Sequence, residues 1–496
     1  MKRLSNATLA GLPPAVERPA YDRAATRIGV VHLGVGAFHR AHQAAYFDER
    51  LAAGEPDWAV CGASLRAPDT TDALTPQDGL YTLAVRSGEG ERLRVIGALR
   101  RLLVAPQDPE ALLAAMAHPD VRIVSLTVTE KGYCHDPATG TLREDHPDIR
   151  ADLARPRAPR TAPGFLVEAL RRRREAGLKA FTVLCCDNLP ANGRTVARVV
   201  GAYASLVDRD LGRFVAGEVA FPSTMVDRIV PATTDADRAA IAASLGVADA
   251  WPVTTEPFTQ WVIEDRFGAG RPRLEESGAE LVADVAPYEL MKLRLLNGSH
   301  STLAYLGYLA GYETVSDVMA DPAFRRLVQG LMDEEVTPTL SVPSGADLAG
   351  YKRSLLARFA NPALRHRTWQ IAMDGSQKLP QRLLGTIRSR LEAGAPFPRL
   401  ALGVAAWMRY VTGIDERGRA IDVRDPLRDS LRALADAAGP DPDALARALL
   451  GVREVFGDLA GDPRLARPVT AALRRLMDAG ARRTVAEWPD PTETEG

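Results

Sequence analysis

The chain has 496 residues, of which 46% are apolar and 25% charged, and its formal net charge is −1. This length predicts two or three domains with cores of their own, and the composition is that of an ordinary globular protein. The near-neutral charge argues against nucleic acid or an anionic membrane as a partner, and no uninterrupted apolar run reaches the roughly 18 residues of a membrane helix.

The N-terminus lacks the apolar segment of a signal peptide, and the four cysteines show no CxxC spacing. A chain this long with so few cysteines does not depend on a disulfide framework. We therefore expect a reduced, cytoplasmic protein without a zinc site.

The first predicted element is a β-branched strand at residues 27–33, followed by Gly34 and Gly36 and an amphipathic helix that extends to about residue 53. Strand, glycine turn and helix are the opening of a dinucleotide-binding βαβ unit, in which the glycines let the backbone approach a pyrophosphate. His39 stands where the third glycine of GxGxxG would be. The motif is partial, so a simple tight turn is the alternative.

A second strand, at residues 58–63, leads into Asp69. An acid at the end of this strand would accept hydrogen bonds from the adenosine ribose and would repel the phosphate of NADP, which favours NAD. Asp69 follows Gly36 at a longer interval than the usual spacing of roughly 20 residues. A loop or N-cap aspartate is therefore the alternative interpretation.

The next predicted elements are a hairpin with strands near 82–86 and 93–97, a helix at 108–117, a strand at 121–128, a helix at 166–176 and an apolar strand at 180–186. Lys131 follows one of these strands and Asn188 follows another, at the strand ends where open α/β sheets bind ligands. Asn188 is either a turn former or an amide donor. Asp227 lies in a segment, 222–229, that mixes apolar residues with acids, as does 255–265; both are typical of cleft walls as well as core.

From residue 287 onward the strand-like runs give way to amphipathic segments, at 288–309, 323–335, 347–359, 397–412, 426–437, 442–456 and 467–485. The sequence therefore predicts an α/β dinucleotide-binding domain of the Rossmann type at residues 1–285 and a mostly α-helical domain at residues 286–496.

Residues 288–309 contain three polar side chains in a helix predicted to be buried. At about 100° per residue, with Lys292 at zero, His300 lies near 80° and Asn297 near 140°. Each would cost on the order of 1–3 kcal/mol if buried without a partner. They form either a satisfied structural network or a catalytic set, in which a desolvated lysine is the base and the amide and imidazole face a substrate oxygen.

Lysine is scarce in this chain, which has only six among its 62 basic residues. Arginine keeps its proton, whereas a buried lysine can be tuned to release it. Lys131, Lys292 and Lys378 all lie in motif-like surroundings, which favours lysine chemistry over charge alone.

Several segments together resemble the long-chain mannitol dehydrogenase family, which spans mannitol 2-dehydrogenase and fructuronate reductase (mannonate oxidoreductase). The resemblance covers nearly the whole chain. Its motifs are Gly-Val-Gly-Ala-Phe-His-Arg-Ala-His-Gln (34–43), Ser-Leu-Thr-Val-Thr-Glu-Lys-Gly-Tyr-Cys (125–134), Cys-Asp-Asn-Leu (186–189), Met-Val-Asp-Arg-Ile (225–229), Glu-Pro-Phe-Thr-Gln-Trp-Val (256–262) and Lys-Leu-Arg-Leu-Leu-Asn-Gly-Ser-His (292–300).

The resemblance implies a metal-independent, NAD-linked interconversion of a secondary alcohol and a ketone. We expect the protein to be a monomer or small homo-oligomer. It implies that Lys292 is the base, that Asn188 and Asn297 stabilise the oxyanion, and that His300 orients the substrate. Substrate contacts are expected from Lys378, Asp227 and Lys131, and cofactor contacts from Gly34, Gly36, Phe38 and Asp69.

Gln370 stands where some mannitol dehydrogenases have an arginine, eight residues before the lysine that matches Lys378. The segment 365–382 looks more like fructuronate reductases, so the expected pair is D-mannonate and D-fructuronate. A carboxylate substrate would need a cation, with Lys131, Arg365 or Arg367 as candidates. The alternatives are a polyol dehydrogenase acting on mannitol/fructose or arabinitol/xylulose, and a regulatory NAD-binding module without turnover. A zinc dehydrogenase is disfavoured because ligand spacing is lacking.

Overall fold

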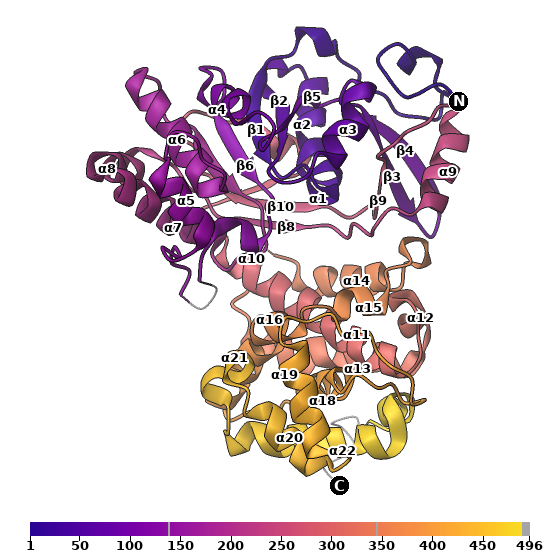
Figure 1. Cartoon of the computed structure of the whole chain (residues 1–496). Coiled ribbons are helices and arrows are strands. Elements are labelled where there is room, and N and C mark those ends of the chain that lie inside the picture. The colour runs from indigo at the N-terminus through magenta and orange to yellow at the C-terminus, as the bar shows by residue number, and fades with distance from the viewer. Residues whose placement is uncertain (137–138, 344–345, 489–496) are drawn as a thin grey trace. The chain divides into compact units, whose positions relative to one another are not determined.

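The computed structural model describes residues 1–136, 139–343 and 346–488, and the chain forms two compact units, Met1–Ala286 and Pro287–Gly496 (Figure 1).

The first unit is built on a five-stranded parallel sheet in the order β5-β2-β1-β6-β7. Its strands are β1 (Ile28–Leu33), β2 (Ala59–Ser64), β5 (Leu99–Val104), β6 (Ile123–Leu126) and β7 (Thr182–Cys185). β1 pairs with β2 on one side and β6 on the other, with Val31 opposite both Cys61 and Val124. The strand order reverses at β1, and the edge beyond this point is where sheets of this type bind ligands. The predicted Rossmann-type fold is confirmed.

Both faces of the sheet are covered, which explains why its central strands are mostly apolar, with His32 and Ser125 as buried polar residues. Val31 and Leu33 face one core, shared with α4 (Pro109–Ala117), α6 (Ala162–Glu175) and α7 (Asn192–Val207). Val30 faces the other core, shared with α2 (Gln43–Ala52) and with the strands β3 (Tyr81–Ser87) and β10 (Gln260–Glu264).

Two three-stranded sheets complete the strand framework of this unit. One has the order β4-β3-β9 and the other β11-β10-β8. The further strands are β4 (Gly90–Ile96), β8 (Thr224–Asp227), β9 (Val253–Thr255) and β11 (Glu280–Val282). The predicted hairpin is confirmed as antiparallel β3–β4. β5 was not predicted from the sequence, because Arg100 and Arg101 interrupt its apolar pattern. It is an edge strand, in which such side chains can reach solvent.

The remaining helices of the first unit are short or peripheral. The α-helices are α1 (Ala37–Ala41), α3 (Asp69–Leu74), α5 (Pro147–Ala154), α8 (Arg209–Glu218) and α9 (Asp235–Leu245). The 3₁₀ turns are η1 (Leu9–Gly11), η2 (Arg23–Ala25), η3 (Pro56–Trp58), η4 (Thr75–Gln77), η5 (Glu130–Tyr133) and η6 (Leu274–Ser277). The single helix predicted after the glycine turn is wrong in detail, since the backbone breaks at His42 between α1 and α2.

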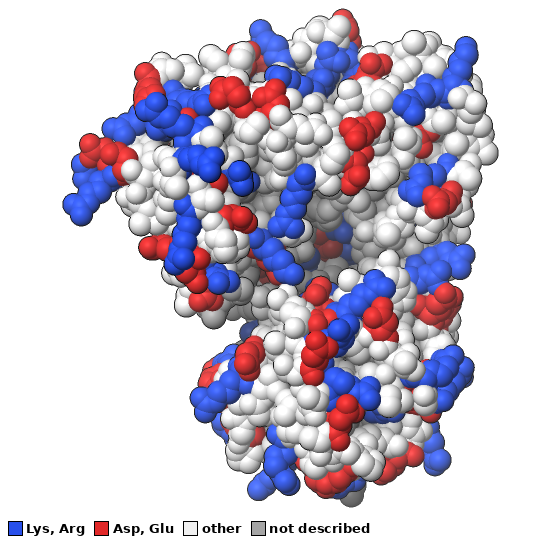
Figure 2. Space-filling model, viewed as in Figure 1, with Lys and Arg blue, Asp and Glu red and all other residues white. Residues whose placement is uncertain are grey.

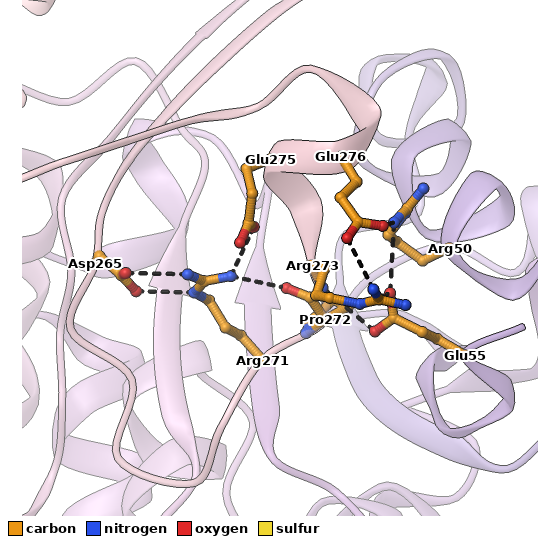
Figure 3. Close-up of polar contacts among 8 residues, drawn as sticks. All are labelled: Arg50, Glu55, Asp265, Arg271, Pro272, Arg273, Glu275 and Glu276. Carbon is orange, nitrogen blue, oxygen red and sulfur yellow. Dashed lines mark hydrogen bonds and ion pairs between the residues drawn. The ribbon is translucent and has the colours of Figure 1, made fainter. Parts of the chain in front are cut away.

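Ion pairs attach the segment between β10 and β11 to the end of α2. Arg50 pairs with Glu276 at 2.7 Å, and Arg273 pairs with Glu276 at 2.8 Å and with Glu55 at 3.3 Å (Figure 3). Most of these groups are partly exposed, so each pair contributes at most about 1 kcal/mol. On the face shown in Figure 2, basic and acidic side chains are interspersed, in keeping with the near-neutral charge.

The second unit is helical. Its α-helices are α10 (Ala286–Met291), α11 (Ser299–Leu309), α12 (Val315–Ala320), α13 (Pro322–Gly330), α14 (Leu348–Phe359), α15 (Thr368–Ala372), α16 (Gly375–Leu379), α17 (Gly385–Glu392), α18 (Pro398–Val411), α19 (Arg428–Ala438), α20 (Pro442–Leu450), α21 (Arg453–Phe456) and α22 (Pro463–Ala486). Short 3₁₀ turns are η9 (Thr337–Thr339), η10 (Pro362–Leu364) and η12 (Gly457–Leu459). α18, almost wholly buried, packs against α11 and α22 at the centre of this core.

Three π-helical segments interrupt these helices: η7 (Lys292–Gly298), η8 (Leu331–Val336) and η11 (Pro380–Leu384). The predicted helix at 288–309 is therefore α10, η7 and α11 in succession, and the one at 323–335 is α13 followed by η8. Hydrophobic periodicity is too coarse to separate a π-turn from an α-turn. Such segments are rare and are found frequently at functional sites.

Candidate functional site

The turn after β1 requires glycine at one position and leaves open space at another. Gly34 has φ +94°, and a Cβ there would lie 2.1 Å from the carbonyl oxygen of Thr127. Gly36 directly precedes α1, and a Cβ there would meet nothing within 4 Å. The backbone at Gly36 is thus open to a ligand, at the sheet edge where a dinucleotide pyrophosphate binds in this type of fold. The residues present fit a dinucleotide.

Beneath this turn, the imidazole of His39 stacks on that of His32, with ring centroids 3.4 Å apart and planes 12° apart. His32 is held by Ser125 Oγ and Thr127 Oγ1, each 2.8 Å away, and Thr127 Oγ1 donates to the carbonyl of Gly34 at 2.7 Å. Burial lowers the pKa of His32 to about 3, and that of His39 also falls. A neutral imidazole, that of His39, therefore stands in place of the third glycine and is stacked on a second neutral imidazole. His32 was not predicted from the sequence, because no motif marks it.

The structure places the other two predicted cofactor contacts near this turn and beyond β2. Phe38 is half-buried in α1 and stacks on His42, with centroids 5.1 Å apart. Asp69 is exposed and is the first residue of α3, separated from β2 by residues 65–68. Its role in cofactor binding stays a prediction.

At the ends of β6 and β7, Asp187 organises the segment that carries Lys131. Its carboxylate accepts hydrogen bonds from the backbone N–H groups of Val128 and Thr129, at 2.9 and 3.1 Å, and from the hydroxyl of Tyr133 at 2.7 Å. Burial raises the pKa of Asp187 to about 6, and these hydrogen bonds oppose the rise. Asp187 lies in the motif at residues 186–189, directly before Asn188, but the motif gives no sign of its role.

Asn188 and Lys131 are exposed at this same edge of the sheet, after β7 and within η5. Asp227, by contrast, is buried, with 3% of its surface exposed, and ends β8 opposite Gln260 of β10. β8 is fixed to the parallel sheet by Thr224, whose hydroxyl donates to the carbonyl of Cys185 at 2.7 Å. The carboxyl edges of β6 and β7 and the end of β8 thus carry three of the predicted site residues.

In the second unit, Lys292 and Asn297 lie in the π-segment η7. The α-helical arithmetic separates them by about 140°. A π-turn joins residue i to residue i+5, so the angular offset between Lys292 and Asn297 is smaller than in an α-helix and both lie toward one face. Lys292 is buried, with 8% exposed, and Asn297 is half-buried. The π-turn therefore brings the amine and the amide closer to a common direction than a regular α-helix, in which they already share one sector, would do.

Gly298 lets this turn approach η11 closely. A Cβ at Gly298 would lie 2.8 Å from the carbonyl oxygen of Arg382. Its own backbone is helical, with φ −64°, so the need for glycine here comes from the neighbouring segment and not from the backbone conformation.

His300 follows in α11 and is buried, with 7% exposed. Its ring stacks on Phe359 at 5.1 Å and meets the edge of His366 at 4.9 Å. Its Nε2 has no hydrogen-bond partner among the described residues. Burial lowers the pKa of His300 well below its ordinary value, and the neighbouring His366 and several cations lower it further. The imidazole is neutral and can direct a ring nitrogen to a substrate hydroxyl.

Lys378 is half-buried and is the last residue but one of α16. Its Nζ donates to the carbonyl of Met373 at 2.5 Å. Of the other cations considered, Arg367 forms an ion pair with Glu313, and Arg365 is exposed in a left-handed conformation with φ +46°. Gln370 is half-buried in α15.

Among residues 1–136, 139–343 and 346–488, no group of three or more His, Cys, Asp or Glu side chains is arranged to hold a metal ion. In the same described part of the chain, every helix is too short or too polar to span a bilayer.

Comparison with known proteins gives matches to two domain families over most of the chain. Residues 28–276 match the mannitol dehydrogenase Rossmann domain, and residues 284–477 match the mannitol dehydrogenase C-terminal domain. D-mannonate oxidoreductase of Escherichia coli is 50% identical over 477 residues, which cover 95% of this chain and 98% of that protein.

Mannitol 2-dehydrogenase of Aspergillus fumigatus is 44% identical over 483 residues, covering 95% of each chain. Among solved structures, Pseudomonas fluorescens mannitol 2-dehydrogenase in a ternary complex with NAD and D-mannitol is similar, with a TM-score of 0.90 and 41% identity over 97% of this chain and 98% of that one.

Proposed function

Because the chain belongs to the mannitol dehydrogenase family of oxidoreductases, we propose that it is an NAD-dependent dehydrogenase that interconverts a secondary alcohol of an acyclic sugar acid and the corresponding ketone. The pair that we propose is D-mannonate and D-fructuronate. The observation that carries the chemistry is the π-turn η7, which presents a buried lysine and an amide on one face.

The proposed cofactor site is the glycine turn, where Gly34 and Gly36 would hold the pyrophosphate of NAD and Asp69 would bind the adenosine ribose. The open backbone at Gly36 and the buried His32–His39 stack below it support this site. NAD bound there would supply the hydride acceptor for oxidation and, in its reduced form, the hydride donor for reduction.

In the proposed reaction, Lys292 Nζ removes the hydroxyl proton during oxidation and returns it during reduction. The side-chain amides of Asn188 and Asn297 donate hydrogen bonds to the oxygen while negative charge develops on it, and one such donor can be worth about 2.7–4 kcal/mol. His300 directs a nitrogen to a neighbouring hydroxyl, while Lys378, Asp227 and Lys131 contact the rest of the substrate. Because the lysine is the base, we propose that no metal ion takes part.

The test of the base is Lys292→Ala, with Lys352→Ala as the matched control, since Lys352 is a lysine of the same unit paired with Asp333. We expect Lys292→Ala to bind NAD normally and to lose at least about a hundredfold in kcat, in the range typical of general base catalysis. Lys352→Ala should keep wild-type turnover. A Lys292→Ala enzyme with a substantial share of the wild-type kcat would refute the assignment.

The test of the substrate is a panel of D-fructuronate, D-fructose, D-mannonate and D-mannitol, followed through the absorbance of reduced nicotinamide. We expect the highest kcat/KM with the sugar acids, and activity that survives a chelator. Preference for D-mannitol would favour the second candidate, a polyol dehydrogenase, which the likeness to the mannitol complex supports. NAD binding without turnover of any substrate in the panel would instead indicate a regulatory module.

A further inference from the structure

Thr129, just beyond the end of β6, has a backbone conformation that residues with side chains rarely adopt. Its φ is +66° and its ψ is 161°, in a region that is essentially restricted to glycine. Its N–H donates to Asp187 Oδ1 at 3.1 Å, and its carbonyl oxygen accepts from the N–H of Gly132 at 2.9 Å. Both peptide groups of Thr129 are therefore held by neighbours, which is the condition under which such strain persists.

The carboxylate that holds Thr129 also holds the peptide group that packs on the glycine turn. The N–H of Val128 donates to Asp187 Oδ2 at 2.9 Å. The carbonyl oxygen of the same peptide group belongs to Thr127, and it is the atom that a Cβ at Gly34 would approach to 2.1 Å. Thr127 Oγ1 in turn donates to the carbonyl oxygen of Gly34 at 2.7 Å. A single peptide group thus separates Asp187 from the turn proposed to bind the pyrophosphate.

Asp187 also directly precedes Asn188, the residue whose amide is proposed to donate to the substrate oxygen. The position of its carboxylate is fixed from the core by Tyr133, a fully buried residue whose hydroxyl donates to Oδ2 at 2.7 Å. The end of β6 and the end of β7 are therefore joined through one anchored carboxylate. On one side of it lies the glycine turn, and on the other side lies Asn188.

We propose that Asp187 is a positioning residue for hydride transfer: by holding Thr129 in its strained conformation, the carboxylate fixes the glycine turn relative to Asn188. This inference rests on the proposed function, in which the turn binds NAD and Asn188 stabilises the oxyanion. Hydride transfer depends on close placement of the reacting groups, and a misplacement of about 1 Å can cost roughly a hundredfold in rate. Asparagine at position 187 would present an NH₂ group where a second carboxylate oxygen now accepts, so Thr129 would be free to relax to an ordinary conformation.

The experiment is a double-mutant cycle in the full-length enzyme, with Asp187→Asn, Thr129→Gly and the two changes combined. We measure kcat and KM for the ketone of the panel that the wild type reduces fastest, and the Kd of NADH by fluorescence titration. Asp187→Asn should lower kcat at least about tenfold and weaken NADH binding, with a smaller change in KM for the ketone. Glycine adopts the conformation of residue 129 without strain. In the Thr129→Gly background, Asp187→Asn should therefore lower kcat about threefold or less, which is a coupling between the two sites.

The matched control is Asp152→Asn. The carboxylate of Asp152 accepts the same set of donors as Asp187, namely two backbone N–H groups, of Arg160 and Thr161, and the hydroxyl of Thr161, at 2.7 to 3.1 Å. Neither donor residue has a positive φ, so no strain depends on this carboxylate. Asp152→Asn should keep the wild-type kcat and NADH affinity even if its melting temperature falls.

If Asp187→Asn costs the same factor in kcat with threonine and with glycine at position 129, the carboxylate does not act through Thr129 and the inference is overturned. An equal loss of kcat in Asp152→Asn would overturn it as well, because any buried carboxylate would then have the same effect. If the wild type reduces no ketone of the panel, the proposed function fails, and the Kd of NADH measured through the same cycle tests the positioning of the turn separately. Should Asp187→Asn not fold, Tyr133→Phe takes its place in the cycle, because it removes the hydroxyl that anchors the same carboxylate.

Discussion

Replacing Gly298 by alanine tests whether the spacing between η7 and η11 sets the geometry of the proposed base. The new Cβ would lie 2.8 Å from the carbonyl oxygen of Arg382 and 3.7 Å from Leu383 Cδ2. An ordinary contact begins near 3.4 Å, so the two segments must separate by about 0.6 Å. Overpacking of this kind costs roughly 1–3 kcal/mol, and the better helix propensity of alanine returns about 1 kcal/mol. The net loss of stability is therefore at most about 2 kcal/mol.

The effect on turnover should exceed the effect on stability. A displacement of about 1 Å can cost roughly a hundredfold in rate, so a shift of about half that size in the turn that carries Lys292 and Asn297 should lower kcat about tenfold. NAD affinity should not change, because the glycine turn belongs to the first unit. Steady-state kinetics, thermal melting and fluorescence titration with NAD measure the three quantities.

Gly385→Ala is the matched control. Gly385 is also a helical glycine, at the start of α17, but its Cβ would meet only the carbonyl oxygen of Pro380 at 3.7 Å, an ordinary contact. This variant should keep wild-type turnover and gain up to about 1 kcal/mol in stability. If Gly298→Ala melts at a lower temperature than Gly385→Ala but keeps the wild-type kcat, the spacing between η7 and η11 does not control the site, and the reasoning is refuted.

Two further predictions concern the first unit. His39→Ala removes the ring stacked on His32 below the glycine turn and should weaken NAD binding at least severalfold in a fluorescence titration. The control, alanine at the exposed His118, should bind NAD as the wild type does. Equal NAD affinities of His39→Ala and the wild type would contradict a role for the stack. Burial raises the pKa of Asp187 from 3.8 to about 6, so the folded state binds this proton more tightly than the unfolded chain, and the stability it contributes is complete below about pH 4 and is lost as the pH rises through 6. Between pH 5 and 7 the wild-type protein should therefore lose about 1 kcal/mol relative to Asp187→Asn in chemical denaturation, and an unchanged difference would contradict the shift.

Local patterns in the sequence predicted the opening of the βαβ unit, the β3–β4 hairpin and the helical character of the second unit. In each case neighbouring residues carry the signal. Gly34 must be glycine because its φ is positive, the hairpin alternates around a Ser-Gly-Glu-Gly turn, and long helices repeat their apolar residues every three to four positions. The family motifs likewise mark Lys292, Asn188 and Asn297 as candidate site residues from the sequence alone.

The tertiary structure decided the features that depend on contacts between distant segments. The stack of His39 on His32 needs β1 and α1 to be folded together, and the carboxylate of Asp187 acts on backbone groups 58 and 59 residues away. The π-turn that brings Lys292 and Asn297 toward one face depends on one extra residue in the hydrogen-bonded ring, a difference to which apolar periodicity is insensitive. The hydrogen bond from Arg382 to Ser301 likewise forms only because η11 packs against α11 in the folded chain. The sequence by itself determined the fold class and the chemical groups, whereas packing determined which groups meet, because a close approach between segments has no local signature along the chain.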